Sequence, residues 1–225
     1  MNNTKSLKKT TPKEIMGNIL RDLFAHPLYL LTHPIKGFDR FRREKTGKAY
    51  VAWFYLAMMI LVNIIAYNGN GFLVNKNNPK DFNVFLIIAL VVFPVAIATV
   101  ANWASTALMD GKGTMANIFG IIGYSFFPYV WLGLSATVIS NFITYEEIIF
   151  FRFLNYLGIL LMAYMMFFGL MGIHEFGLMK TVMMFVFTVV AIAAVLFVIL
   201  LFLSLIQYVY SFIDSIIDEF IWRFW

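Results

Sequence analysis

The loop Asp110-Gly-Lys-Gly-Thr114 is the first candidate for chemistry, because a glycine-flanked lysine followed by threonine is typical of loops that bind phosphate. A P-loop requires Gly-x-x-x-x-Gly-Lys-Ser/Thr between a strand and a helix, so that successive backbone N–H groups surround the phosphate. Here Thr106 stands five residues before Gly111, and a second glycine separates Lys112 from Thr114. We therefore expect no nucleotide. The glycines would permit a tight turn, Thr114 would cap the next helix, and Lys112 would contact lipid headgroups on the inner side.

The pair His174-Glu175 has the residue types of a zinc site in which histidines bind the metal and a glutamate acts as base. A zincin helix places its second histidine three residues after the glutamate, and that position is Leu178. The other two histidines, His26 and His33, stand in a basic N-terminal segment. The chain has no cysteine, which excludes disulfides, thiolate ligands and cysteine nucleophiles. We expect no metal and no cofactor, and interpret His174 and Glu175 as a polar cap at the end of an apolar segment.

Glu146 and Glu147 are the remaining candidates, because two neighbouring carboxylates can divide the roles of acid and base. Adjacent residues on a helix point in different directions, so these two do not form a working pair without other partners. Thr144 precedes them and can cap a short helix. We expect solvated acids in a loop. The sequence therefore offers no convincing nucleophile, base or metal set for an enzyme.

The composition indicates which solvent the chain needs. Of its 225 residues, 61% are apolar and 13% are charged, against about 45–50% and about 25% in ordinary soluble domains. The mean hydropathy is +0.81. A soluble protein of this size could not bury so much apolar surface, so we expect an integral membrane protein.

Five apolar segments are long enough to cross the roughly 30 Å hydrocarbon layer as helices. They cover residues 49–67, 84–109, 118–140, 153–173 and 181–206. The predicted fold class is all-α: a polytopic membrane protein with five transmembrane helices and amphipathic interfacial helices at its N- and C-terminal ends. We divide the chain into a basic arm (1–48), a five-span domain (49–206) and an amphipathic C-terminal helix (207–225).

Lysines and arginines set the expected orientation, because they are retained on the cytoplasmic side. Of the 17 Lys and Arg residues, 11 lie in residues 1–48. A cytoplasmic arm places 13 of the 17 inside, including Lys112 and Lys180, and leaves Lys76, Lys80, Arg152 and Arg223 outside. We therefore expect a cytoplasmic N-terminus and an outer C-terminus.

The basic arm carries two predicted interfacial helices. The first begins at Thr11-Pro12, where threonine can cap and proline can take the first helical position, and it ends at His26-Pro27. The second sets Ile35, Phe38 and Phe41 among arginines and lysines, a pattern typical of a helix on an anionic inner leaflet. A simpler interpretation, in which these positive residues only keep the arm on the cytoplasmic side, is compatible with this one. The chain shows no feature that predicts nucleic acid as a partner.

The C-terminal segment, residues 207–225, is also amphipathic. Its apolar residues recur every four, opposite Asp214, Asp218 and Glu219. Because this face is acidic, attraction to anionic lipid would not hold it. Its aromatic residues are suited to the membrane interface. The alternative is that the segment packs back on the bundle.

Within the predicted spans, polar groups are mild and charges are scarce. The polar residues are Asn63, Thr99, Asn102, Ser125, Thr137, Asn155 and Ser204. Such groups more often join helices than move ions, whereas transporters usually keep ionisable groups or interrupted helices near the midplane. Pro94 and Pro128 can bend two spans that flank one inner turn, which keeps open a cavity and a transport function.

Five stretches in order along the chain resemble the bacterial branch of the Yip family, the Ypt/Rab-interacting-protein domain. They are HPIKGFDRFRREKTGK, NWASTALMDGKGT, GYSFFPYV, SNFITYEE and GIHEFGLMKT, and the resemblance runs from about His33 to the C-terminus. The motif positions that the resemblance implies are Asn102, Trp103, Asp110, Gly111, Lys112, Gly113, Tyr124, Ser125, Pro128, Ser140, Asn141, Thr144, Glu147 and His174.

The resemblance implies a five-span protein with a cytoplasmic N-terminus, and its bacterial branch implies a bacterial plasma membrane. Eukaryotic relatives bind prenylated small GTPases, but this arm is short and basic, and a bacterial cell lacks the prenylated partner, which weakens the expectation of a GTPase here. We expect a non-enzymatic scaffold or accessory subunit that contacts anionic lipids and other membrane proteins or itself. The alternative is a small-solute permease or channel, with Pro94, Asn102, the Gly-Lys-Gly turn, Tyr124, Ser125 and Pro128 lining an inward-facing cavity.

Overall fold

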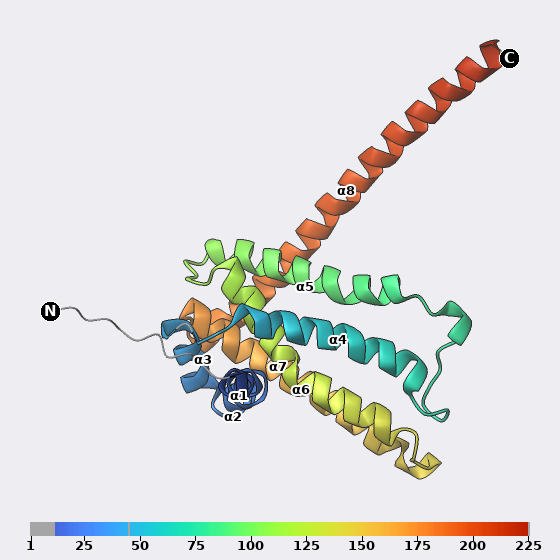
Figure 1. Ribbon diagram of the computed structural model, residues 1–225. Coiled ribbons are helices and arrows are strands. Elements are labelled where there is room, and N and C mark those ends of the chain that lie inside the picture. Colours follow the sequence, from blue (N-terminus) through green and yellow to red (C-terminus); the bar gives the residue numbers. More distant parts are fainter. Residues whose placement is uncertain (1–11, 45, 225) are drawn as a thin grey trace.

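The computed structural model describes residues 12–44 and 46–224, and the regular structure in these ranges is helical (Figure 1). The five longest helices are α4 (Ala49–Gly69), α5 (Val84–Ala107), α6 (Met115–Ile139), α7 (Ile148–His174) and α8 (Leu178–Phe224). Each contains a stretch long and apolar enough to cross a membrane. The five predicted spans and the all-α membrane fold are therefore confirmed. Short 3-10 helices, η2 (Pro79–Asp81) and η3 (Tyr145–Glu147), lie in two of the loops.

Helix α6 is the centre of the bundle. In its most apolar stretch 67% of the residues are buried, a larger share than in any other span, because α4 and α7 pack along it. Glycine allows the close approach of α4: a Cβ on Gly123 would lie 2.6 Å from the Cα of Ala52. Small residues bring helices together in this way where lipid gives no hydrophobic drive for association.

Helices α5 and α8 form a second, looser part of the molecule. The N-terminal part of α8 packs on α5, and the helix then leaves the bundle (Figure 1). At 1.5 Å per residue its 47 residues extend about 70 Å, more than twice the hydrocarbon thickness. Residues 207–223 continue the same helix and are exposed, so this part of the C-terminal segment does not pack back on the bundle.

The basic arm is helical across the predicted stop at His26-Pro27, so that prediction was wrong. Helix α1 (Pro12–Leu20), the π-helix η1 (Arg21–Ala25) and α2 (His26–Thr32) follow one another without a break. Pro27 has no N–H to donate to the carbonyl of Leu23, four residues earlier. The Tyr55 hydroxyl of α4 donates to that carbonyl instead, at 2.5 Å. A hydrogen bond from another helix therefore allows the arm to continue through the proline.

Helix α3 (Pro34–Arg43) lies on α7. The sequence pattern predicted that Ile35, Phe38 and Phe41 face lipid, but two of these three side chains are buried in the protein. Phe38 is fully buried and Phe41 nearly so, whereas Ile35 is 66% exposed. A Cβ on Gly169 would lie 3.2 Å from the Phe38 ring, and one on Gly172 would lie 3.0 Å from the Phe38 Cβ. The two glycines of α7 thus provide the space for the Phe38 ring.

Candidate functional site

His174 is the centre of a polar network at the end of the bundle that carries α3. It is the last residue of α7 and is buried. The N–H of Gly113 donates to its Nδ1 at 3.2 Å, and its Nε2 lies 3.3 Å from Oδ1 of Asn102 on α5. Because a backbone N–H can only donate, Nδ1 is the acceptor and Nε2 carries the proton. The loop after α5 therefore fixes the tautomer of this histidine.

The network continues from Asn102 to α8. The Asn102 amide donates to Oγ1 of Thr188 at 3.0 Å, and the Thr188 hydroxyl donates to the carbonyl of Met184 at 2.8 Å. Ser105 Oγ lies 3.0 Å from Thr188 Oγ1. We call Asn102, Ser105, Gly113, His174 and Thr188 the His174 network. It joins α5, the following loop, α7 and α8 through hydrogen bonds between buried polar groups.

Sequence reasoning found part of this network. Asn102, Gly113 and His174 were predicted motif positions, but nothing in the sequence related them to one another. Ser105 and Thr188 were missed. Thr188 is the one polar residue among residues 182–203. A hydroxyl in a helix often bonds only the backbone of its own helix. Its spacing thus gave no signal for a partner on α5.

The two glycines of the loop serve close packing rather than a special backbone conformation. A Cβ on Gly111 would lie 2.6 Å from His174 Nδ1, and one on Gly113 would lie 2.6 Å from His174 Cε1. Neither glycine has a positive φ; the left-handed residue in the loop is Asp110, at φ 57°. We expected the glycines to permit the turn through their backbone freedom, and that reason was wrong: they are needed because His174 leaves no room for a side chain. Thr114 does cap α6, since its side chain accepts the N–H of Asn117 at 3.3 Å.

Glu175 connects the same loop to the basic arm. It is the left-handed cap of α7, at φ 57°, and its N–H donates to the carbonyl of Met171, as the predicted polar cap required. Its carboxylate pairs with Arg42 of α3 and with Lys112 of the loop. Hydrogen bonds from Lys112 and Arg42 lower the pKa of Glu175. We expected Lys112 to contact lipid headgroups, but its ammonium group pairs with this carboxylate instead.

A second polar cluster, which we call the Asp22 cluster, lies where the arm meets α4 and α6. Buried Asp22 of η1 accepts hydrogen bonds from the Lys48 ammonium and, at 2.6 Å, from the Tyr50 hydroxyl. Burial by itself raises the pKa of Asp22, but these two hydrogen bonds and the nearby cations outweigh it, so the pKa is lowered. The Lys48 N–H donates to the hydroxyl of Tyr124, at 3.1 Å.

Beside this cluster, the His26 ring meets the Tyr124 ring edge-on, at a centroid distance of 5.5 Å. Burial lowers the pKa of His26. Of these residues, sequence analysis had named only Tyr124 as a motif position. Sequence reasoning missed Asp22 because a carboxylate in a basic arm is ordinarily solvated. It therefore also missed the two side chains that bond this carboxylate, Lys48 and Tyr50.

A third group of motif positions lies at the opposite end of the bundle. Ser140 Oγ accepts the N–H of Gly71 at 2.7 Å, and the Asn141 amide donates to the carbonyl of Gly69 at 2.9 Å. A Cβ on Gly71 would lie 1.9 Å from the Ser140 carbonyl oxygen, so only glycine fits here. Thr144 and Glu147 form a capping box on η3, as the predicted cap required. These contacts hold the loop after α4 against the end of α6.

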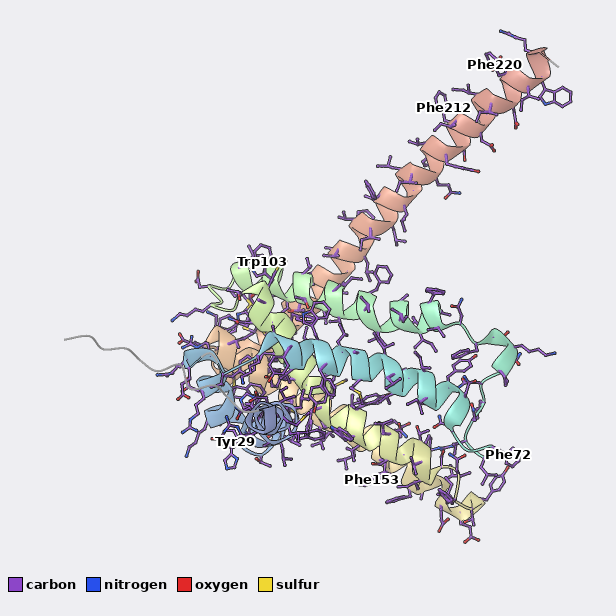
Figure 2. The ribbon with its side chains drawn as sticks, viewed as in Figure 1. Tyr29, Phe72, Trp103, Phe153, Phe212 and Phe220 are labelled. Atoms are coloured by element: carbon purple, nitrogen blue, oxygen red, sulfur yellow. The ribbon has the colours of Figure 1, made fainter. Side chains whose placement is uncertain are left out.

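The remaining motif positions do not join these groups. Ser125 is buried and donates to the carbonyl of Ile121 at 2.7 Å, and Pro128 is buried in α6. Trp103 is 45% exposed and points away from the bundle (Figure 2). Asp110 is exposed. The predicted positions therefore lie in separate places, mainly at the two ends of the bundle, and do not form one reactive centre.

The polar side chains of these groups connect helices and loops to one another. The ring nitrogens of His174 and the carboxylates of Asp22 and Glu175 already have protein partners. Within residues 12–44 and 46–224, no group of three or more His, Asp or Glu side chains is placed to hold a metal ion. What the arrangement does chemically is to satisfy buried polar groups and fix the ends of the spans relative to the arm.

The comparisons with known proteins give one result. The model of the Yip1 domain family matches residues 28–217, from within α2 to near the end of α8. The match includes all five spans, the His174 network and the contacts of Ser140 and Asn141, whereas Asp22 lies before its first residue. Comparison with curated proteins and comparison with solved structures each find no match.

Proposed function

The chain belongs to the Yip1 domain family and is an integral membrane protein, and from this premise we propose that it is a non-enzymatic scaffold or accessory subunit that associates laterally with other membrane proteins. The observation that carries the proposal is an apolar groove between α5 and α8. The groove has a volume of about 390 Å³ and is lined by Ala104, Ser105, Leu108, Met109, Phe187, Val190, Ala191 and Ala194.

The groove suits a helix of a partner protein. Ala104, Ala191 and Ala194 give its lining three small side chains, and small residues let two helix backbones approach closely in lipid. Val190 in its lining is 62% exposed, and in the most apolar 18-residue stretch of α8 no residue is buried within the chain. The His174 network fixes the neighbouring ends of α5 and α8, so the groove has a defined shape before a partner arrives.

The orientation that we propose places the arm in the cytoplasm, against the anionic inner leaflet of the plasma membrane. Lys36, Arg40 and Arg43 of α3 are exposed at the end of the bundle where the arm lies. Each cation near an anionic surface contributes about 1 kcal/mol to attraction. The opposite topology would place most of the positive residues outside, against the usual distribution.

A solute pathway has less support than lateral association. Of the residues expected to line it, Pro94 borders a cavity between α4 and α5. Tyr124, Ser125 and Pro128 are instead buried in helix contacts, and Asn102 is hydrogen-bonded to His174 and Thr188. They therefore do not share a common cavity with Pro94.

Site-specific photo-crosslinking in intact membranes tests lateral association. A benzophenone amino acid would replace Val190 in the groove and, as the control, Leu160 on α7, which is 63% exposed and outside the groove. We expect discrete protein adducts from position 190 and not from position 160. No adduct at position 190, or the same adducts at both positions, would contradict the proposal.

A further inference from the structure

A second cavity lies between α4 and α5, at the end of the bundle opposite the basic arm. Its volume is about 470 Å³, within the roughly 300–1,000 Å³ range of small-molecule sites. The cavity is separate from the three groups of polar contacts and from the groove between α5 and α8. The question is which ligand its lining would recognise.

The lining changes from polar to apolar along the length of α5. Asn70, Asn77, Asp81 and Asn83 lie at the loop end, and Leu90, Val91, Pro94 and Phe126 lie deeper. Eleven residues of helix separate Asn83 from Pro94, or about 16 Å, close to half of the roughly 30 Å hydrocarbon layer. The cavity therefore has the depth of one leaflet, with its polar end at the level of the headgroups.

Three hydrogen-bond acceptors at the cavity lack a partner among the described residues. Asn70 Oδ1 is buried and has no hydrogen bond in the described part of the chain. Pro94 lacks an N–H, so the carbonyl of Leu90 receives no helical hydrogen bond from it. Asp81 is the one charged residue of the described lining, and it forms no ion pair with the described residues. Such a site favours a ligand that donates hydrogen bonds and carries positive charge.

We propose that this cavity binds a membrane lipid with a primary ammonium headgroup, from the leaflet opposite the basic arm. The ammonium group donates to the Asp81 carboxylate and the Asn70 amide oxygen. One hydrocarbon chain lies along Leu90, Val91 and Phe126. A trimethylammonium headgroup has the same charge but no N–H, so it leaves the acceptors unsatisfied.

Native mass spectrometry of the full chain in mild detergent tests the proposal. The probes are phosphatidylethanolamine and phosphatidylcholine with identical acyl chains, added together at equal concentration. We expect about two- to fivefold more retained phosphatidylethanolamine, the ratio that corresponds to about 0.5–1 kcal/mol for one net hydrogen bond. Equal retention would overturn the proposal. Displacement of the lipid by soluble glycerophosphoethanolamine would overturn the assignment to a lipid.

Matched variants locate the binding. Asp81→Asn should abolish the preference, whereas Glu146→Gln, which removes an exposed carboxylate in η3 outside the cavity, should preserve it. Ala66→Phe fills the cavity and should abolish binding, whereas Ala57→Phe, on the exposed side of α4, should not. A preference that survives both cavity variants would show that the lipid binds elsewhere. Elution as a monodisperse species confirms that each variant is folded. None of these results depends on photo-crosslinking at Val190.

Discussion

His174 accepts a hydrogen bond from the backbone N–H of Gly113, 61 residues earlier, and the two residues pack so closely that no side chain fits between them. The loop that looks like a phosphate-binding sequence therefore surrounds an imidazole ring. Its lysine neutralises the glutamate beside that ring. This relationship gives the loop a structural function and makes it testable.

Gly113→Ala should destabilise the protein. The new Cβ would lie 2.6 Å from His174 Cε1, and overpacking of this kind costs about 1–3 kcal/mol in the free energy of unfolding. A thermal-unfolding assay in detergent should show a lower Tm. Gly177→Ala is the matched control, because a Cβ there meets nothing within 4 Å. Equal Tm values for the two variants would show that the contact with His174 is not tight.

Asn102→Leu should remove the bridge between His174 and Thr188. It would leave the buried Nε2–H of His174 without a partner, at a cost of about 1–3 kcal/mol in unfolding free energy. The cost of Asn102→Leu combined with Thr188→Val should be non-additive by more than about 0.5 kcal/mol. Asn155→Leu, whose amide bonds only the carbonyl of Phe151 in its own helix, is the control and should cost less. Additive costs would argue that the two residues are not coupled.

Tyr55→Phe should loosen the arm. Without the hydroxyl, the Leu23 carbonyl opposite Pro27 loses its partner, so the helix there should open more often. Hydrogen–deuterium exchange should be faster at backbone amides between residues 21 and 32. Tyr156→Phe removes a hydroxyl from an exposed side chain of α7 and should leave this exchange unchanged. Unchanged exchange in Tyr55→Phe would show that the proline needs no such compensation.

Acid should weaken the attachment of the arm through Asp22. Its folded pKa lies below the ordinary value of 3.8, so its contribution to stability is fully present well above pH 3.8 and is lost as pH falls through the folded pKa. Hydrogen exchange of the arm should be expressed as protection factors, which remove the intrinsic pH dependence of amide exchange. The difference in protection between wild type and Asp22→Asn should be constant from pH 7 to pH 5 and should shrink below pH 3.8. Asp218→Asn, exposed on α8, should leave the wild-type profile unchanged, and an identical profile in Asp22→Asn would contradict the assignment.

The sequence alone was sufficient for features that depend on nearby residues or on the solvent. The five spans follow from the length of each apolar run, since a helix in lipid must satisfy its own backbone hydrogen bonds. The caps at Thr114 and Thr144 follow from side chains that reach only three residues along the chain.

Only the tertiary structure decided which polar groups become partners. Asn102 and Thr188 are 86 residues apart, and Asp22 and Lys48 are joined across the start of α4. Hydropathy reports which solvent a residue prefers, but it does not specify which of several buried acceptors meets a given donor. That choice follows from the packing angles of the helices, which side chains on every helix determine together. The same packing made Gly113 a contact for His174 and let the arm continue through Pro27.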